Sequence, residues 1–143
     1  MIVSLEPNNK VLWKQFLHDF LTVLDEAILE EELQYNPYIR YLFYRKDDHI
    51  VVFLNYSLIY DRIEINQILV LEEFQKRGIA SSLLEYLFAL AKEHHIKNVT
   101  LEVKSDNVKA IRLYEKFGFE KKAIRAKYYN GVDGILMEKE MMK

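Results

Sequence analysis

The feature that most restricts the fold is a strand, a glycine turn and a long helix in close succession. Ile63 to Val70 is rich in strand-forming residues, and Ile79 to Glu93 repeats apolar residues with the period of a helix. Gly78 lies between them, where the absence of a side chain lets a ligand approach the backbone. A chain with this unit needs a sheet with a helix packed on its face.

The segment Gln75-Lys76-Arg77-Gly78-Ile79-Ala80 also suggests a chemistry. The first turn of a helix has unpaired N–H groups and a partial positive charge, which suit a phosphate or pyrophosphate. Lys76 and Arg77 add full positive charges. The segment lacks the glycine pattern of a dinucleotide site and the Gly-Lys-Ser/Thr end of a P-loop. Either a phosphorylated cofactor binds here or this is an ordinary basic helix start.

Composition indicates one ordinary domain, which we expect to span residues 1–143. Half of the 143 residues are hydrophobic, and ten tyrosines and eight phenylalanines are available for a core. The formal net charge of −2 argues against electrostatic binding of nucleic acid. The chain has no cysteine, which excludes disulfides, thiolate metal ligands and a covalent cysteine intermediate. We expect no metal.

The N-terminal residues predict a cytoplasmic protein. Met1 to Pro7 contain no basic region followed by an apolar segment, so we expect no signal peptide. No apolar run approaches the ~20 residues that span a bilayer. The expected protein binds no membrane and is a monomer or a homodimer.

The remaining elements follow from hydrophobic periodicity, capping residues and turns. Expected strands span 2–5, 39–45, 49–60, 63–70, 98–103, 119–129 and 132–140, and expected helices span 10–20, 24–33, 79–93 and 108–117. Lys46-Asp47-Asp48 and Asn130-Gly131 are typical of hairpin turns. This order predicts an α+β fold, with a mixed sheet of about seven strands flanked by about four helices.

The strand at 63–70 changes phase within its length. Ile63 and Ile65 are apolar at odd positions, whereas Ile68 and Val70 are apolar at even positions, with a polar pair between them. Such a change predicts a β-bulge, which leaves backbone groups able to meet a ligand. The alternative is a strand buried on both faces near its end.

Three motifs, in order, resemble the GNAT superfamily of acyl-CoA-dependent N-acetyltransferases. They are Gln75-x-x-Gly78-x-Ala80, Leu101-Glu102-Val103-Lys104-Ser105-Asp106-Asn107 and Ala110-Ile111-x-x-Tyr114-x-x-x-Gly118-Phe119. Together they cover about half of the chain. Within the superfamily, the second and third motifs and Arg125-x-x-Tyr128-Tyr129 are most similar to the RimI-type enzymes, which acetylate the N-terminal α-amine of a ribosomal protein.

The resemblance implies a fold with a V-shaped cleft between the fourth and fifth strands, and acetyl-CoA as co-substrate. The backbone of Ile68, Leu69 and Val70 would pair with the pantetheine arm like an added strand. The implied pyrophosphate site follows Gln75 and consists of the backbone amides of Lys76, Arg77, Gly78, Ile79, Ala80 and Ser81. The side chain of Asn107 would meet the cofactor.

Glu102 is the candidate general base. Val99, Leu101 and Val103 point to one face of their strand and Glu102 points to the other. An amine must be neutral to attack a thioester, and an α-amine has a pKa of ~8 against ~10.4 for lysine, so a carboxylate suffices for an α-amine. Glu102 matches the position of the general base in RimI-type enzymes. The alternative is a surface or salt-bridged glutamate.

Tyr114 is the candidate general acid. Its hydroxyl, with an ordinary pKa of ~10, can donate to the departing thiolate at neutral pH. Spacing alone favours a core tyrosine on an amphipathic helix, whereas the matched motif favours the acid. Because the chain has no cysteine, we expect direct attack in a ternary complex. The oxyanion would be met by a backbone N–H, that of Val70.

Other polar and aromatic residues have ordinary explanations. His94-His95 end a helix, and adjacent histidines point to different sides, so a metal site is not expected there. Tyr128-Tyr129 either line the acceptor pocket or fill a strand, and Asp133 is equally ambiguous.

The first half of the chain departs from the RimI pattern. The Pro-Trp pair common near its first helices is absent, and the loop 71–74 lacks the usual Asp-Pro. Since the early helices of this fold contact the acceptor, the departures concern the acceptor more than the cofactor. We expect a protein or peptide α-amine, such as that of a ribosomal protein. The alternatives are a lysine side chain, a polyamine or small amine, and an acyl-CoA-binding module without turnover.

Overall fold

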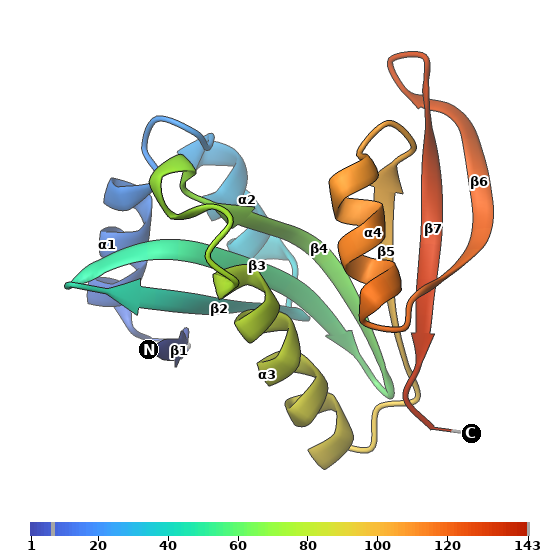
Figure 1. The fold of residues 1–143 in the computed structure, drawn as a ribbon. Helices are drawn as coiled ribbons and strands as arrows, with labels where there is room; N and C mark the ends of the chain where they lie inside the picture. The colour runs from blue at the N-terminus through green and yellow to red at the C-terminus, as the bar shows by residue number, and fades with distance from the viewer. Residues whose placement is uncertain (7, 143) are drawn as a thin grey trace.

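The computed structural model describes residues 1–6 and 8–142, without the side chains of Tyr128 and Tyr129. In this part of the chain, seven strands and four α-helices form a single mixed sheet with helices on both faces (Figure 1). The strands are β1 (Ile2–Ser4), β2 (Ile39–Lys46), β3 (His49–Ile59), β4 (Arg62–Val70), β5 (Asn98–Lys104), β6 (Glu120–Tyr129) and β7 (Val132–Glu140). The helices are α1 (Lys10–Asp19), α2 (Glu26–Tyr35), α3 (Ile79–Glu93) and α4 (Val108–Lys116), with a 3₁₀ turn η1 (Glu72–Phe74).

The strand order is β1-β2-β3-β4-β5-β7-β6. All neighbouring strands are antiparallel except β4 and β5, which are parallel. Parallel neighbours need a crossover connection, and α3 provides it. The predicted class, a mixed sheet of about seven strands with about four helices, is confirmed.

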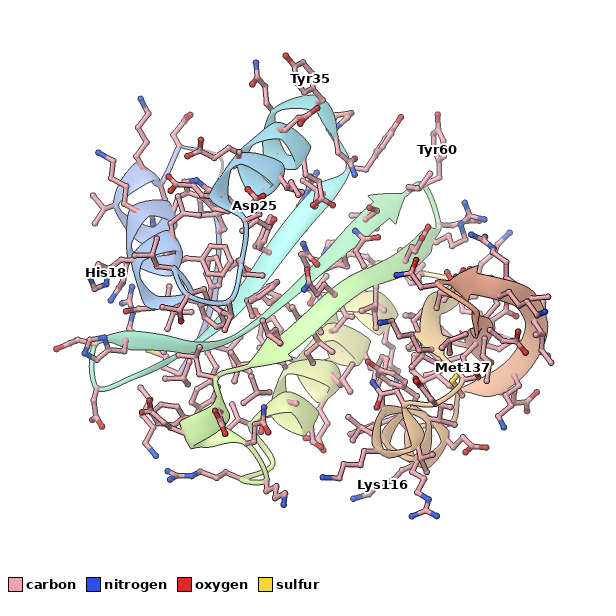
Figure 2. All side chains as sticks on the ribbon, turned by 90° about the horizontal axis from the view of Figure 1, so that it is seen from above. His18, Asp25, Tyr35, Tyr60, Lys116 and Met137 are labelled. Carbon is pink, nitrogen blue, oxygen red and sulfur yellow. The ribbon has the colours of Figure 1, made fainter. Side chains whose placement is uncertain are left out.

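Two hydrophobic cores lie on the two faces of the sheet. The central core packs α3 and α4 on one face; its buried members are Leu42, Val51, Val52, Leu54, Tyr56, Ile63, Ile65, Ile79, Leu83, Leu84, Leu87, Ala91, Ile96, Val99, Leu101, Val103, Ile111, Tyr114, Phe119, Ile135 and Met137. The aromatic core packs α1 and α2 on the other face; its buried members are Leu12, Phe16, Phe20, Leu29, Ile39, Tyr41, Phe43, Ile50 and Phe53. Seen from above, His18 and Asp25 lie on one side of the central strands and Lys116 of α4 lies on the other (Figure 2).

Local sequence explains where the helices begin. The side chains of Asn9, Asp25 and Asn107 each accept a hydrogen bond from a backbone N–H in the first turn of α1, α2 and α4. The turn before β3 has Asp47 and Asp48 at positive φ, the geometry of a tight hairpin. These caps and this turn follow from short-range sequence alone.

Most predicted boundaries lie within two residues of the observed ones, and α3 spans 79–93 as predicted. The α2 prediction began at residue 24, but the helix begins at Glu26 because Asp25 is its cap. The turn η1 was not predicted. Among the described residues, none of the helices combines the length and apolar character needed to cross a membrane.

Candidate active site

The sheet opens between β4 and β5. The two strands pair from Arg62 opposite Asn98 to Ile65 opposite Leu101, and the pairing ends there. Beyond this point the ends of β4 and β5 diverge (Figure 1). The opening coincides with the predicted position of the V-shaped cleft, between the fourth and fifth strands.

A β-bulge lies on β4 where the pairing with β5 ends. On β3, Asn55 pairs with Gln67 and its neighbour Tyr56 pairs with Ile65, so Asn66 is an extra residue. The Asn66 side-chain amide donates to the Ser57 hydroxyl at 3.0 Å. The predicted change of phase is therefore confirmed as a bulge.

The end of β4 directs backbone groups into the opening. The N–H of Leu71 donates to the carbonyl of Val51 on β3 at 2.9 Å. Because consecutive residues of a strand direct their N–H and C=O groups to opposite sides, those of Val70 and Ile68 point away from β3. The side chains of Ile68 and Val70 pack on the central core, whereas Leu69 packs on the aromatic core. These are the backbone groups predicted to pair with the pantetheine arm.

The N-terminus of α3 lies just after this strand end. Gly78 is the cap residue with φ of 75°, and it has no side chain to accept from the N–H groups of the first turn; the Ser82 hydroxyl donates to the Gly78 carbonyl at 3.2 Å. The N–H of Ser82 donates to the Gly78 carbonyl at 3.2 Å, and the N–H groups before it belong to the first turn, which precedes the helical ladder. Lys76 also has positive φ, at 62°. Alternating left-handed residues form a concave row of N–H groups that suits an anion.

Side chains around this turn hold it against the sheet. The Gln75 amide donates to the carbonyl of Val70 at 3.3 Å. The Arg77 guanidinium lies 5.3 Å from the ring centre of Phe74, within cation–π distance. The predicted pyrophosphate segment, from Gln75 to Ser81, thus lies as one continuous stretch beside the opening.

Tyr114 lies in the central core on α4. It is buried, and its ring contacts that of Phe119 with centroids 5.7 Å apart. Burial raises the pKa of the Tyr114 hydroxyl above its usual value, so the hydroxyl stays protonated at neutral pH. Asn107, at the start of the same helix, uses its side-chain oxygen to cap Ala110 N–H at 3.2 Å. That cap bond does not involve the amide nitrogen of Asn107.

Glu102 is the first residue of β5 beyond the pairing with β4. Val99, Leu101 and Val103 are buried in the central core, so Glu102 points to the opposite face, as predicted. Its carboxylate is partly buried, with the side chain 22% exposed, and lies 3.5 Å from the guanidinium of Arg125. Glu102 therefore lies just beyond the β4–β5 pairing, on the face of the sheet opposite to the central core that holds Tyr114.

Comparison with known sequences decides the family. A sequence model of the Acetyltransferase (GNAT) family matches residues 6–119. The chain belongs to the acetyltransferase (GNAT) family. It is accordingly an acetyl-CoA-dependent N-acetyltransferase, and the predicted resemblance is confirmed.

Two relatives carry the names of ribosomal-protein acetyltransferases. A Bacillus subtilis protein, provisionally named [ribosomal protein bS18]-alanine N-acetyltransferase, is 33% identical over 108 residues, 74% of this chain and 72% of its own length. The [ribosomal protein bS18]-alanine N-acetyltransferase of Salmonella typhimurium is 34% identical over 88 residues, 62% of this chain and 60% of its own length. The chain therefore spans less than two thirds of the second relative.

Solved structures share the fold. The ribosomal-protein-S18-alanine N-acetyltransferase from Escherichia coli has a TM-score of 0.85 at 23% identity, covering 100% of this chain and 94% of that chain. A GNAT family acetyltransferase from Elizabethkingia anophelis, solved with acetyl-CoA bound, has a TM-score of 0.78 at 19% identity, covering 98% of this chain and 97% of that chain. At these identities the likeness establishes the GNAT fold alone.

Asp133, ambiguous from sequence, links two loops of the GNAT domain. Its carboxylate accepts from the backbone N–H of Lys127 at 2.8 Å, and its carbonyl accepts from the backbone N–H of Ser105 at 2.8 Å. Lys127 has a positive φ of 51° where the register of β6 and β7 is irregular. Asp133 thus fixes the path of β6 toward Tyr128 and Tyr129, whose side chains lie outside the described part of the chain.

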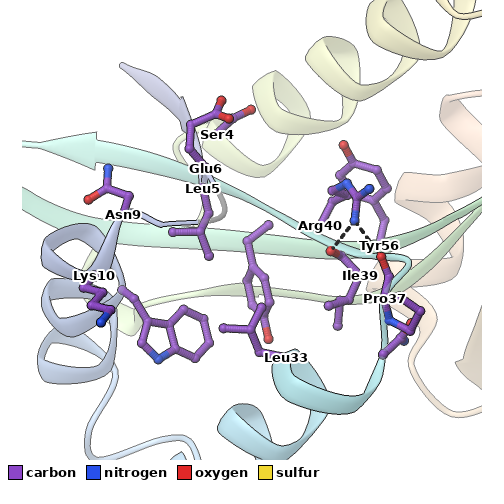
Figure 3. Close-up of a pocket in the computed structure, with 13 residues that line it drawn as sticks. Ser4, Leu5, Glu6, Asn9, Lys10, Leu33, Pro37, Ile39, Arg40 and Tyr56 are labelled. Atoms are coloured by element: carbon purple, nitrogen blue, oxygen red, sulfur yellow. Dashed lines mark hydrogen bonds between the residues drawn. The ribbon is translucent and has the colours of Figure 1, made fainter.

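A cavity lies elsewhere in the molecule. A space of about 750 Å³ is bounded by the end of β1, the start of α1, the end of α2 and the start of β2 (Figure 3). Trp13, Leu33 and Ile39 supply apolar walls, and the Arg40 guanidinium donates to the carbonyls of Pro37 and Ile39. None of the predicted site residues lines this cavity. The predicted site residues Ile68 to Val70, Gln75 to Ser81 and Glu102 lie instead along the end of β4, the start of α3 and β5 just beyond its pairing with β4.

Sequence reasoning missed the partner of Glu102. Arg125 entered only as part of a motif, although a salt-bridged Glu102 was one of the alternatives. The histidines at the end of α3 behave as expected for a helix end: the N–H of His94 caps the carbonyl of Leu90 at 3.0 Å. Within residues 1–6 and 8–142, no group of three or more acidic or histidine side chains is arranged to hold a metal.

Proposed function

We propose that this GNAT protein acetylates the N-terminal α-amine of a protein or peptide, with alanine as the first residue and ribosomal proteins among its acceptors. The observation that carries the proposal is the position of Glu102 and Tyr114. They lie on opposite faces of the sheet, Glu102 on β5 just beyond its pairing with β4 and Tyr114 in the central core on α4. The names of the relatives supply the class of acceptor.

The residues present fit acetyl-CoA as the co-substrate. The uncapped first turn of α3, with left-handed backbone at Lys76 and Gly78, offers N–H donors for the pyrophosphate. Ile68 and Val70 direct backbone groups into the opening, where an amide-containing arm would pair with them. The amide nitrogen of Asn107 would add a side-chain donor. The thioester of the bound co-substrate supplies the acetyl group.

The side chains then divide the proton transfers. Glu102 accepts the proton that the attacking amine loses as its nitrogen bonds to the acetyl carbon. The N–H of Val70 donates to the developing oxyanion. Tyr114 donates its proton to the sulfur as the carbon–sulfur bond breaks, because burial keeps its hydroxyl protonated. The products are an amide and a free thiol, with no covalent enzyme intermediate.

An α-amine suits this site better than a lysine side chain. A carboxylate base removes a proton from a group with a pKa of ~8 far more readily than from one with a pKa of ~10.4. The charged groups that share the face of Glu102 include Glu64 and Glu138, both paired with Thr100 in the sheet register. Arg62, Lys104 and Arg125 lie on the same face, so this surface carries charges of both signs.

The decisive experiment uses three acceptors with one readout. Three acceptors are each incubated with acetyl-CoA. The first is a peptide that begins with alanine, with a free N-terminus and no lysine. The second is the same peptide with a blocked N-terminus and one lysine, and the third is spermidine. Thiol release and mass spectrometry of the product are followed. We expect acetylation of the first peptide at its α-amine. Acetylation confined to lysine or spermidine would refute the acceptor, and calorimetric binding without any turnover would refute the activity.

A further inference from the structure

The partner of Glu102 reaches it from a strand that is not its neighbour. Glu102 lies on β5 opposite Leu136 of β7, and Arg125 lies on β6 opposite Gly134 of β7. The Nη2 atom of Arg125 is nevertheless 3.5 Å from the Oε2 atom of Glu102. The arginine side chain therefore spans the whole width of β7 on the face opposite the central core.

A glycine on β7 makes this crossing possible. Residues that pair directly across neighbouring strands point to the same face, so Glu102, Leu136, Gly134 and Arg125 share one face. Gly134 lies opposite both Arg125 and Lys104 and contributes no side chain to this face. The direct route from Arg125 to β5 is thus free of a β7 side chain at that position.

We propose that Arg125 is a positioning residue for acetyl transfer, which holds the Glu102 carboxylate at the edge of the opening. This inference rests on the proposed role of Glu102 as the base. A glutamate has several rotatable bonds, and a base misplaced by about 1 Å loses much of its efficiency. An ion pair from a second strand restricts those rotations and fixes the carboxylate where the amine arrives.

Charged residues of both signs share this face with the ion pair. Glu64 of β4 and Glu138 of β7 both pair with Thr100, which precedes Glu102 by two residues on β5. The Glu138 carboxylate accepts a hydrogen bond from the Asn98 side-chain amide at 3.2 Å. The cations on this face of the described strands include Arg62, Lys104 and Arg125, and the Arg125 guanidinium lies 3.5 Å from the Glu102 carboxylate. The positive charge of Arg125 counters the repulsion between Glu102 and the other carboxylates on this face.

A stability role does not explain the pair. The Arg125 side chain is 57% exposed, and an ion pair in that setting contributes little to folding because solvent and salt screen it. The effect of removing Arg125 is therefore expected in turnover rather than in unfolding. Its effect should also depend on the presence of the Glu102 carboxylate.

A double-mutant cycle tests this dependence. Arg125→Met, Glu102→Gln and the double variant are compared with the unaltered protein for kcat, for KM of acetyl-CoA and for the unfolding midpoint. We expect Arg125→Met to lower kcat about 10-fold with the acetyl-CoA KM and the midpoint unchanged. In the Glu102→Gln background the same substitution should change kcat by less than about 2-fold. Arg125→Lys should restore part of the loss, because it keeps the charge but not the fork geometry.

Lys122→Met provides the matched control. Lys122 is a cation on the same strand, and it pairs with Glu120 at 3.3 Å rather than with Glu102. It should leave kcat unchanged. Equal kcat losses from Arg125→Met in both backgrounds would overturn the inference, as would an unchanged kcat in Arg125→Met. If Glu102→Gln leaves kcat unchanged, both the proposed role of Glu102 as the base and this inference are wrong. If Glu102→Gln lowers kcat but Arg125→Met does not, only this inference is wrong.

Discussion

The two halves of the sheet are built differently. Strands β2 and β3 are covered on both faces, by the central core on one and the aromatic core on the other. Strands β5 and β7 contribute buried residues to the central core alone, and in the described part of the chain none of their residues belongs to the aromatic core. Their other face carries Glu102, Leu136 and Glu138, which stay partly or fully exposed.

This difference separates stability from chemistry. The half with two cores is the rigid support from which β4 and α3 extend, and its ring contacts are dense. The half with one core leaves a face open beside the gap, and the candidate base lies on it. An acceptor approaching that face meets Glu102 without displacing packed side chains.

The largest expected effect tests the covered half. Phe16 is fully buried, and its ring centroid lies 4.9 Å from that of Phe43 and 5.0 Å from that of Phe53. Phe16→Ala should lower the free energy of unfolding by about 3–5 kcal/mol, measured by urea denaturation. Leu136→Ala, on the open face at 38% exposure, should cost less than about 1 kcal/mol. Equal losses of unfolding free energy in the two variants would contradict the difference in packing between the two halves of the sheet.

The next effect concerns catalysis at the opening. Tyr114→Phe should lower kcat about 100-fold with a near-normal acetyl-CoA affinity, because it removes only the donated proton. Tyr56→Phe is the control, since Tyr56 is also buried in the central core and burial also raises its pKa. Steady-state kinetics that gave the two variants the same kcat would remove Tyr114 from the mechanism.

A smaller effect concerns the turn before α3. Gly78 has a φ of 75° with no atom within 4 Å of an added Cβ, so Gly78→Ala introduces backbone strain without a clash. The strain should cost about 1–2 kcal/mol and weaken acetyl-CoA binding several-fold in calorimetry. Gly131→Ala carries a similar strain, at φ of 92° and also in open space, on the β6–β7 turn. Gly131→Ala should lower the free energy of unfolding by a similar amount but leave the affinity for acetyl-CoA unchanged. If both variants lost acetyl-CoA affinity equally, general backbone strain rather than a binding site at Gly78 would explain the loss.

The smallest effect concerns a polar group inside the aromatic core. Burial, above all, raises the pKa of the Tyr41 hydroxyl to about 12; the Glu32 carboxylate adds to this and the Asn55 amide offsets part of it. The unfolded chain loses that proton near pH ~10, so this contribution to stability is present below pH 10 and is lost as pH rises toward 12. Tyr41→Phe should change stability at pH 7 by less than about 1 kcal/mol and flatten the decline between pH 10 and 12. An unchanged alkaline decline in urea midpoints would contradict this.

The elements were predictable because their signals are local. Caps at Asn9 and Asn107, the period of α3 and the phase change near Asn66 are all contained within a few residues. The GNAT family followed from three motifs, and the sequence match confirms it. The roles of Glu102 and Tyr114 remain predictions; Glu102 lies just beyond the β4–β5 pairing and Tyr114 is buried in the central core.

The interactions that were missed depend on strand register. Arg125 meets Glu102 only because β7 lies between β5 and β6 with Gly134 opposite the arginine. Asp133 joins Lys127 to Ser105 for the same reason. The pairs Glu102–Arg125 and Ser105–Asp133 join residues more than twenty positions apart, and the pair Lys127–Asp133 crosses an irregular hairpin. No short sequence pattern predicts such pairs.

The extra residue at Asn66 decides the side to which the end of β4 directs its peptide groups. With it, Leu69 packs toward α1 and α2 while Ile68 and Val70 turn their peptide groups to the gap. If the same residues continued as a regular strand, these directions would be exchanged, sending the peptide groups of Leu69 to the gap and its side chain toward α3. The bulge therefore lets Ile63 and Ile65, and then Ile68 and Val70, face the same core although the two pairs differ in phase along the sequence.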